Sequence, residues 1–536
     1  MTARTAGGLR SQLDSVPLAP LACLLALSAA ALVVVFLSTR QGIGLRDDSF
    51  HYFTAAEGLV TGQGYGRTNA AGEWTPLTNF PPGYSALLAG LHLAGLELAA
   101  AARLINGLAL AALMSLVGLS VFAATNRPWL GVVIGGLALL SPSLIEVYAW
   151  AHSEPVYLAL MAGGVLVMAG ALHQSHDNRL QWPAAGLLLA AAALTRYVGA
   201  AAWLVALTAI VLTRRSRGRI SDKLPLASVG LLPALGLGMF VVRNWLVSGG
   251  LANRPAPYWH PPEAANLAQG GATVLGWLLP SAWLPSMPPA LLGAVLLLLA
   301  GLAAPLVALR LANSVYAARQ PQLPIRAGII GLHGSHALVY AGLLIVSLLF
   351  FDRLTPLDSR ILSPILVSLL VLLGAGLGAA MDRAKPKGQR LLLLAVLVLV
   401  GLTAFAGWST LRQRTAESLG FNSPVWRSSL AMEVVASLPE RPVYTNNVAA
   451  FYFLAQRSVA SIPIRTDPAS GQPRSDYLAQ LAAMHADLQA TSGYLILLGW
   501  PPEGRVEPDQ LADLTARMDL LERTRDGLIY CYCQGD

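Results

Sequence analysis

Charged residues are scarce in this chain. Only 12% of its 536 residues are Asp, Glu, Lys or Arg, whereas 55% are hydrophobic, and a soluble domain carries about a quarter charged residues. Lysine occurs three times and cysteine three times. We infer neither a disulfide framework nor a metal site from the three cysteines. The shortage of charge excludes an ordinary soluble globular protein.

Long apolar runs take the place of the missing charge. Runs of about twenty apolar residues are long enough to cross a bilayer, and we expect the first to be a retained membrane helix rather than a removed signal peptide. The chain is thus predicted to be an α-helical polytopic membrane protein with about eleven transmembrane helices. The expected spans are 18–37, 104–124, 129–145, 155–172, 183–195, 197–212, 224–247, 291–309, 327–351, 361–380 and 391–408.

The basic residues predict the orientation of these helices. Short loops rich in Lys and Arg tend to stay in the cytoplasm. When residues 183–212 are counted as two passes that meet at Arg196, every basic loop falls on one side. We therefore expect a multi-pass plasma (inner) membrane protein with a cytoplasmic N-terminus. The net charge of +8 is then a topology signal, and we expect no nucleic acid partner.

The chain is predicted to have two domains. Residues 1–410 form the transmembrane domain, and residues 38–103 form its first large outer loop. Residues 411–536 have a soluble composition in which helical periods alternate with short apolar strands. This alternation predicts a small extracytoplasmic α/β domain.

Two adjacent acids follow the first apolar run, in the segment "LRDDSFHYFTAAEGLVTGQGYG". One of them, Asp47 or Asp48, is a suitable cap for the helix that follows, because Asp is a preferred N-cap residue. Capping does not need a second carboxylate, however. In a helix, Asp48, His51 and Tyr52 also share one face. A cap and a catalytic acid are compatible roles.

The opposite side of the same helix is apolar. Phe50 and Phe53 lie along it, and we expect them to rest at the membrane interface while the polar face looks into a cavity. Loops that are distant in sequence bring further polar groups to the same predicted outer level. These groups are His152, Ser153, Glu154, Arg196, Arg243, Asn244, Asp358 and Arg360.

The order of several motifs resembles the GT-C superfamily of integral membrane glycosyltransferases. The branch concerned contains lipid A aminoarabinose transferases and protein O-mannosyltransferases. The resemblance spans roughly the first 380 residues. Besides the acidic segment, it rests on "FPPGYSALLAGLHLAGL", "SEPVYLAL", "LTRYVG", "RNWLVSG" and "DSRILSP".

The resemblance implies transfer of a hexosyl or pentosyl group from a polyprenyl-phosphate donor to an acceptor on the outer face. The acceptor is a lipid, a glycan or a protein, and membrane lipids surround the enzyme. Asp47 or Asp48 is implied as the catalytic carboxylate, and relatives with a single acid favour Asp48. No cofactor is certain. A divalent cation is an open possibility, since some members bind one through acidic loop residues.

The remaining polar residues receive roles from this chemistry. A carboxylate beside the acceptor hydroxyl can take its proton, and arginine suits the leaving phosphate. A base and a leaving group on opposite faces of the sugar predict inversion. We assign the donor phosphate to Arg196, Arg243 and Arg360. The expected substrate-binding residues are His51, Tyr52, Tyr84, His152 and Glu154.

Two other functions are compatible with this sequence. A transporter or flippase would move a lipid-linked sugar unchanged, although transporters are usually built from symmetric repeats with broken helices, and none is detectable. An inactive scaffold of an envelope assembly would depend on the C-terminal domain and be indifferent to Asp47 and Asp48.

Overall fold

A computed structural model of the chain describes residues 17–68, 74–173, 179–217, 224–250, 257–277, 279, 287–295, 298, 325–500 and 506–532. The chain divides into two compact units. The first unit consists of Met1–Arg40, Thr78–Leu87 and Ala99–Ala416. The second consists of Gln41–Leu77, Leu88–Leu98 and Glu417–Asp536.

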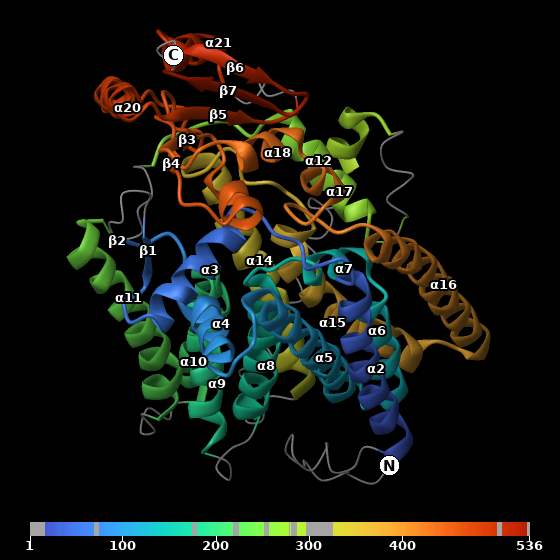
Figure 1. Cartoon of the computed structure of the whole chain (residues 1–536). Helices are drawn as coiled ribbons and strands as arrows, with labels where there is room; N and C mark the ends of the chain where they lie inside the picture. Colours follow the sequence, from blue (N-terminus) through green and yellow to red (C-terminus); the bar gives the residue numbers. More distant parts are fainter. Residues whose placement is uncertain are drawn as a thin grey trace. The chain divides into compact units, whose positions relative to one another are not determined.

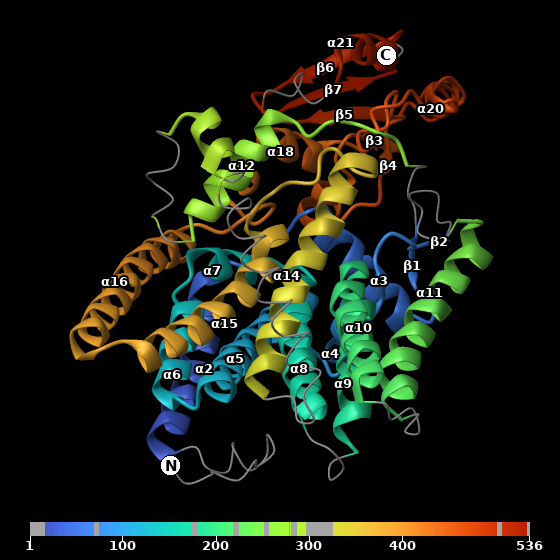
Figure 2. The ribbon, with the colours of Figure 1, turned by 180° about the vertical axis from the view of Figure 1, so that it is seen from behind.

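The first unit is helical (Figures 1 and 2). Helix α8 packs against α9 and α14, and α14 packs against α15. Side chains such as Leu113, Met161 and Val367 are fully buried between these helices. Its elements are α2 (Leu18–Ser38), α5 (Leu98–Thr125), α6 (Pro128–Leu139), α7 (Pro142–Tyr148), α8 (Glu154–His173), α9 (Gln181–Thr195), η1 (Tyr197–Gly199), α10 (Ala200–Arg217), η2 (Leu226–Leu231), α11 (Leu232–Ser248), α12 (Ala264–Leu275), α14 (Ile325–Phe350), α15 (Ser359–Arg383) and α16 (Pro386–Ala416).

Seven helices in the described ranges are long and apolar enough to cross a membrane, and the bent pair of α6 and α7 makes a possible eighth. Two shorter apolar helices, Gln181–Thr195 and Tyr197–Val211, come in addition. The prediction of a multi-pass membrane protein is confirmed. Ten of the eleven expected spans coincide with these helices, whereas most of the expected span 291–309 lies outside the described residues.

The predicted break at Arg196 is present. Helix α9 ends at Thr195, Arg196 is extended with φ −148° and ψ 136°, and a short 3₁₀ turn leads into α10. An extended residue cannot continue the α-helical hydrogen-bond ladder. The basic loop charges therefore located this turn correctly.

A second break lies inside a span that we predicted to be continuous. Residues 129–145 form α6 and α7, which meet at an angle of 61°. Pro142 stands at the start of α7, where it lacks the N–H that a continuous helix would need, and its ring clashes with the residue four positions before it. The expected single straight helix is wrong for this reason.

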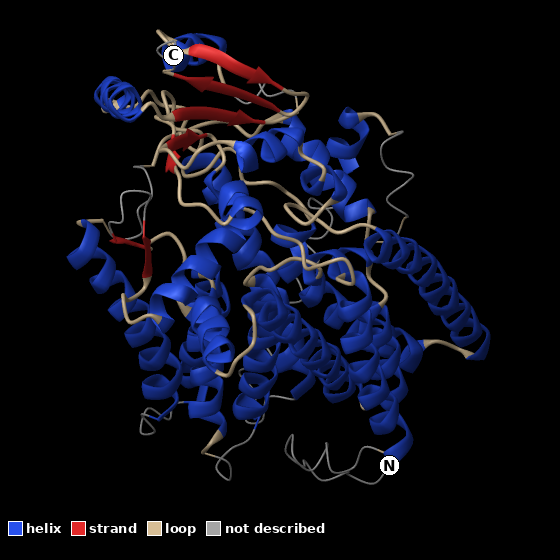
Figure 3. Cartoon of the chain, in the orientation of Figure 1, coloured by secondary structure: helices blue, strands red, loops and turns tan. Residues whose placement is uncertain are grey.

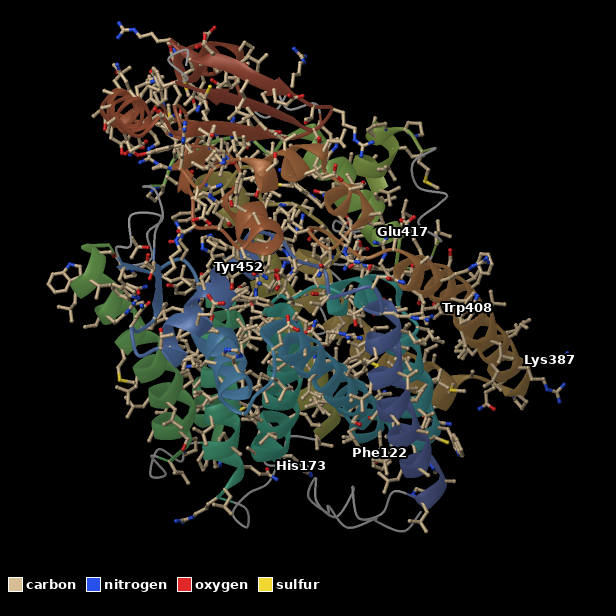
Figure 4. All side chains as sticks on the ribbon, viewed as in Figure 1. Phe122, His173, Lys387, Trp408, Glu417 and Tyr452 are labelled. Carbon is tan, nitrogen blue, oxygen red and sulfur yellow. The ribbon has the colours of Figure 1, made fainter. Side chains whose placement is uncertain are left out.

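Helix α16 is longer than the predicted span 391–408. The apolar run stops at Trp408, but α16 spans Pro386–Ala416. Figure 4 labels Lys387 near the start of this helix and Trp408 along it, and the Trp408 side chain is exposed. Hydropathy marks the apolar part of a helix and not its full length, because polar turns continue the same hydrogen-bond pattern.

The second unit contains a five-stranded sheet, seen as the larger group of arrows in Figure 3. The strand order is β4-β3-β5-β7-β6; β3 pairs in parallel with β4 and β5, and β7 pairs antiparallel with β5 and β6. The strands are β3 (Val443–Thr445), β4 (Ala460–Ser461), β5 (Tyr494–Leu498), β6 (Asp519–Arg523) and β7 (Gly527–Cys531). The helices are α17 (Pro424–Arg427), α18 (Leu430–Ser437), α19 (Val448–Ala450), η4 (Phe451–Ala455), α20 (Tyr477–Thr491) and α21 (Pro508–Thr515).

The predicted small α/β region is thus confirmed, with two differences. The helical period of residues 508–520 predicts one helix, but α21 ends at Thr515 and β6 begins at Asp519. We inferred no disulfide, yet Cys531 at the end of β7 is disulfide-bonded. Sequence spacing without side-chain direction cannot exclude such a bond.

The first large loop contributes to this second unit. It supplies α3 (Asp47–Val60) and the antiparallel hairpin of β1 (Gly66–Thr68) and β2 (Trp74–Pro76). Backbone hydrogen bonds join Leu45 to Leu419 and Phe421. The loop is therefore tied to the start of the C-terminal segment. Helix α4 (Gly83–Leu93) begins in the first unit and ends in the second.

Candidate functional site

Helix α3 carries the two predicted catalytic acids in its first turn. Arg46 is the N-cap residue, and its backbone N–H donates to the Ser49 hydroxyl over 3.1 Å. The expectation that an aspartate caps this helix is wrong, because the capping position falls one residue earlier. Asp47 is exposed and Asp48 is partly exposed, and both negative charges stand at the positive end of the helix dipole.

His51 lies one turn further along α3 and is half-buried. Burial lowers the pKa of His51 to about 4; the positive charge of Arg67 adds to this effect, and the negative charge of Asp48 opposes it. The imidazole is therefore neutral at pH 7. It can donate or accept a hydrogen bond beside Asp48, as the shared helix face predicted.

The apolar side of α3 is covered by protein. The ring of Phe50 lies 5.2 Å from that of Tyr452, and the ring of Phe53 lies 5.8 Å from that of Phe453. The expected contact of these two residues with the membrane interface is thus wrong. An amphipathic period shows that one side of a helix is buried but not what buries it.

A hydrogen bond reinforces this packing. The Tyr452 hydroxyl donates to Glu57 of α3 over 2.6 Å; Figure 4 labels Tyr452. Burial, together with the negative charge of Glu57, raises the pKa of Tyr452. The phenol therefore keeps its proton and continues to donate. Sequence analysis missed this pair because the two residues are far apart in the chain.

Arg67 is a further charged residue near the acids that sequence analysis missed. It belongs to β1, and its guanidinium carbon lies 5.3 Å from the centre of the Phe50 ring. Its charge also acts on His51. The only sequence signal was a single basic residue after a glycine-rich turn.

In the first unit, Glu154 brings together two of the three predicted phosphate-binding arginines. Glu154 begins α8 and is 2% exposed. Its Oε1 lies 2.5 Å from Nη1 of Arg196 and 3.4 Å from Nε of Arg360. Arg196 follows α9, and Arg360 lies in the first turn of α15. Three helix ends therefore meet at one buried ion-pair cluster.

Neighbouring residues support this cluster. Arg196 also donates to the Ser153 hydroxyl over 3.2 Å. The N-cap Asp358 accepts from the N–H of Ile361 over 3.0 Å and so fixes the start of the helix that carries Arg360. Each cation is thus held by its own local structure as well as by the carboxylate.

Tyr84 and His152 are buried in the same unit. Tyr84 is the second residue of α4. Gly83, the first residue, is required there, since a Cβ on it would lie 2.8 Å from the Leu194 carbonyl oxygen. Burial, with a smaller contribution from Glu154, raises the pKa of Tyr84. The ring of His152 stacks on Trp150 with centres 5.6 Å apart and an angle of 3°.

Arg243, the third predicted phosphate ligand, belongs to a second polar group. It lies in the C-terminal half of α11 and donates to the side chain of Asn244 over 3.1 Å. Asn244 in turn donates to the Tyr197 hydroxyl and to the Thr78 carbonyl, each over 3.2 Å. Tyr197 follows Arg196 directly, so the two groups are adjacent along the chain.

Tyr52 is only 1% exposed and lies on the packed side of α3.

Sequence analysis also missed two buried histidines in α14. His336 bonds to Ser368 over 3.0 Å and to Tyr157 over 3.2 Å, and His333 lies 3.5 Å from Ser368. The sequence did contain a signal for this group, since both histidines interrupt an apolar run.

No group of three or more His, Cys, Asp or Glu side chains that could hold a metal ion is found among the described residues. Exhaustive chelation tests whether the protein depends on a divalent metal.

No family model and no curated protein matches this sequence. A solved structure is similar, however. ArnT from Cupriavidus metallidurans bound to undecaprenyl phosphate aligns over 95% of this chain and 98% of its own, with a TM-score of 0.51 and 16% identity. This chain shares its fold with ArnT. The apo state of the same ArnT gives a TM-score of 0.50 and 15% identity over 95% of this chain and 97% of its own.

The shared fold confirms the helical multi-pass architecture that the sequence led us to expect. At 16% identity the similarity establishes the fold, and the roles of individual residues remain predictions.

Proposed function

We propose that this protein is a membrane glycosyltransferase that moves a sugar from a polyprenyl-phosphate donor to an acceptor at the extracytoplasmic face of the plasma membrane. The observation that carries the proposal is the GT-C fold over 95% of the chain, shared with a protein crystallised with undecaprenyl phosphate. The positively charged loops support a cytoplasmic N-terminus.

In the proposed reaction, Asp48 or Asp47 accepts the proton of the acceptor nucleophile as the new bond to the anomeric carbon forms. The bond between this carbon and the phosphate oxygen breaks, and the electron pair leaves with the polyprenyl phosphate. The first turn of α3 suits the base, because both carboxylates are at least partly exposed. Displacement from opposite sides inverts the anomeric centre.

Arg196 and Arg360 are suited to the leaving phosphate. Their side chains are 19% and 18% exposed although both contact the buried Glu154. A guanidinium has five N–H donors in a rigid fork, and this planar fork matches the oxygens of a phosphate. We assign Glu154 the role of orienting both forks and keep Arg243 as a third candidate.

Product analysis tests the proposal. The full chain is reconstituted in liposomes with a panel of radiolabelled undecaprenyl-phosphate pentoses and hexoses and with a membrane extract as the source of acceptors. We expect label to pass to an acceptor as undecaprenyl phosphate is released. Relocation of intact donor across the bilayer would identify a flippase instead. The absence of both release and relocation would favour a scaffold. Repeating the transfer after exhaustive chelation determines whether a divalent cation takes part.

A further inference from the structure

The first turn of α15, which carries Arg360, is only partly held by the helix's own hydrogen bonds. Pro364 lies inside α15, and a proline has no N–H to donate to the carbonyl four residues before it. That carbonyl belongs to Arg360. The Ser363 hydroxyl donates to it over 2.8 Å instead. The backbone ladder is therefore interrupted one turn after the helix begins, and the position of this turn depends on contacts from outside α15.

Tyr340 of α14 provides such a contact. Its hydroxyl donates to the Ile361 carbonyl over 2.8 Å, and Ile361 follows Arg360 directly. Tyr340 and Ile361 are both buried, and α14 packs along α15, as Figure 2 shows. A buried donor without its acceptor is unfavourable, so this bond fixes the backbone beside Arg360 relative to α14.

Tyr340 also lies beside the ion-pair cluster. The charges of Glu154, Arg196 and Arg360 act on its phenol. Within the cluster, Nε of Arg360 lies 3.4 Å from Oε1 of Glu154, whereas Nη1 of Arg196 lies 2.5 Å from the same atom. The contact of Arg360 is the longer one, and an ion pair depends on both distance and direction. The placement of the Arg360 backbone therefore decides how well its guanidinium meets the carboxylate.

We propose that Tyr340 is a positioning residue, which holds Arg360 against Glu154 by fixing the first turn of α15. A role of Arg360 in sugar transfer rests on the proposed function. The positioning itself rests on the contacts among Tyr340, Ile361, Arg360 and Glu154, and it would hold for any reaction at this cluster.

A double-mutant cycle tests the positioning without reference to catalysis. The midpoint of thermal unfolding is measured in detergent for the full chain, for Tyr340→Phe, for Glu154→Gln and for the double variant. Tyr340→Phe removes only the hydroxyl and keeps the ring. Ser368→Ala, alone and with Glu154→Gln, is the matched control. Ser368 is also buried and also joins α15 to α14, through a 3.0 Å bond to His336, but it lies about two turns beyond Arg360.

We expect the shift caused by Glu154→Gln to be smaller by about a third in the Tyr340→Phe background, because contacts in one network are not additive. In the Ser368→Ala background the two shifts should add. Full additivity in the Tyr340→Phe background would overturn the proposal. An equal reduction in the Ser368→Ala background would also overturn it, because it would mean a general loosening of α14 from α15. If Tyr340→Phe does not fold, Tyr340→Met, which lacks a donor and adapts to its packing, takes its place under the same criteria.

Transfer kinetics separate this outcome from the fate of the proposed function. If Arg360 stabilises the leaving phosphate, Tyr340→Phe should lower kcat by about tenfold and change KM less than about twofold, since the lost stabilisation is greatest in the transition state. Ser368→Ala should leave both values unchanged. A non-additive cycle with unchanged kinetics in Tyr340→Phe would support the positioning and count against a role of Arg360 in transfer. A wild type without transfer activity would count against the transferase, and the unfolding cycle would still decide the role of Tyr340.

Discussion

The carboxylates of the two units stand in opposite environments. Glu154 in the first unit is 2% exposed and contacts two guanidinium groups. Asp47 in the second unit is exposed and Asp48 is partly exposed, and the charge of Asp48 acts on the pKa of His51. A buried acid between two cations is fixed in place, whereas an accessible acid can meet an incoming hydroxyl. The difference supports our proposal that Glu154 has a positioning role and that an acid of α3 takes the proton.

The largest expected effect is on proton transfer. Asp48→Asn should lower the transfer rate by between about 100-fold and 10,000-fold, the usual contribution of a general base, because the amide cannot take the proton. Asp47→Asn is compared in parallel, since the adjacent acid is the other candidate. Rates are measured on reconstituted protein, and Asp519→Asn in β6 is the control. Wild-type rates in both single variants would remove the acids of α3 from the mechanism.

The second effect concerns the buried cluster. Glu154→Gln should reduce the free energy of unfolding by about 3 kcal/mol, because two partly buried cations would lose their shared counter-charge. The midpoint of thermal unfolding in detergent measures this change. Asp382→Asn is the control, since Asp382 pairs with Arg127 at the surface over 2.8 Å, and surface pairs contribute little. An equal shift in both variants would mean that Glu154 has no special role.

The third effect is a pH dependence of stability. The pKa of His51 is about 4 in the folded protein and 6.5 when unfolded. Above pH 6.5 the ring is neutral in both states, so it contributes no pH dependence. As the pH falls from 6.5 to 4, only the unfolded state gains the proton, and stability should fall by at most about 3 kcal/mol.

Thermal unfolding at pH 7, 5.5 and 4.5 measures the decline attributed to His51. His51→Gln, which cannot titrate in this range, should show a smaller decline. Parallel curves for the wild type and His51→Gln would argue against a buried neutral imidazole.

The smallest expected effect concerns the contact between α3 and the C-terminal segment. Tyr452→Phe should cost about 2 kcal/mol of unfolding free energy, because the hydrogen bond to Glu57 is charge-assisted. Glu57→Gln keeps an acceptor oxygen and should cost less. Unfolding midpoints of the two variants test this order. A larger loss in Glu57→Gln than in Tyr452→Phe would show that Glu57 has another partner.

Patterns that repeat along the chain predicted much of this fold. Apolar runs located ten of the eleven expected spans, and the distribution of basic loops placed a turn at Arg196, where the backbone is extended. The bend before Pro142 was missed, because composition stays apolar across it. Strand β6 was missed because its residues continue a helical period from α21.

Side-chain contacts were harder to predict than elements. Glu154, Arg196 and Arg360 were each named, but only the folded chain shows that they form one ion-pair cluster. Arg67 and the bond between Tyr452 and Glu57 matched no motif, because a lone basic residue after a glycine-rich turn is a weak signal and Tyr452 is far from Glu57 in sequence. Packing between distant segments decides such contacts, and periodicity does not contain that information.

A density map of the full chain with a bound undecaprenyl-phosphate sugar would test the central claim most directly. We expect the phosphate on one or more of the named arginines and the anomeric carbon facing a carboxylate of α3, with room for an acceptor hydroxyl between them. A sugar bound far from both Asp47 and Asp48 would contradict the account.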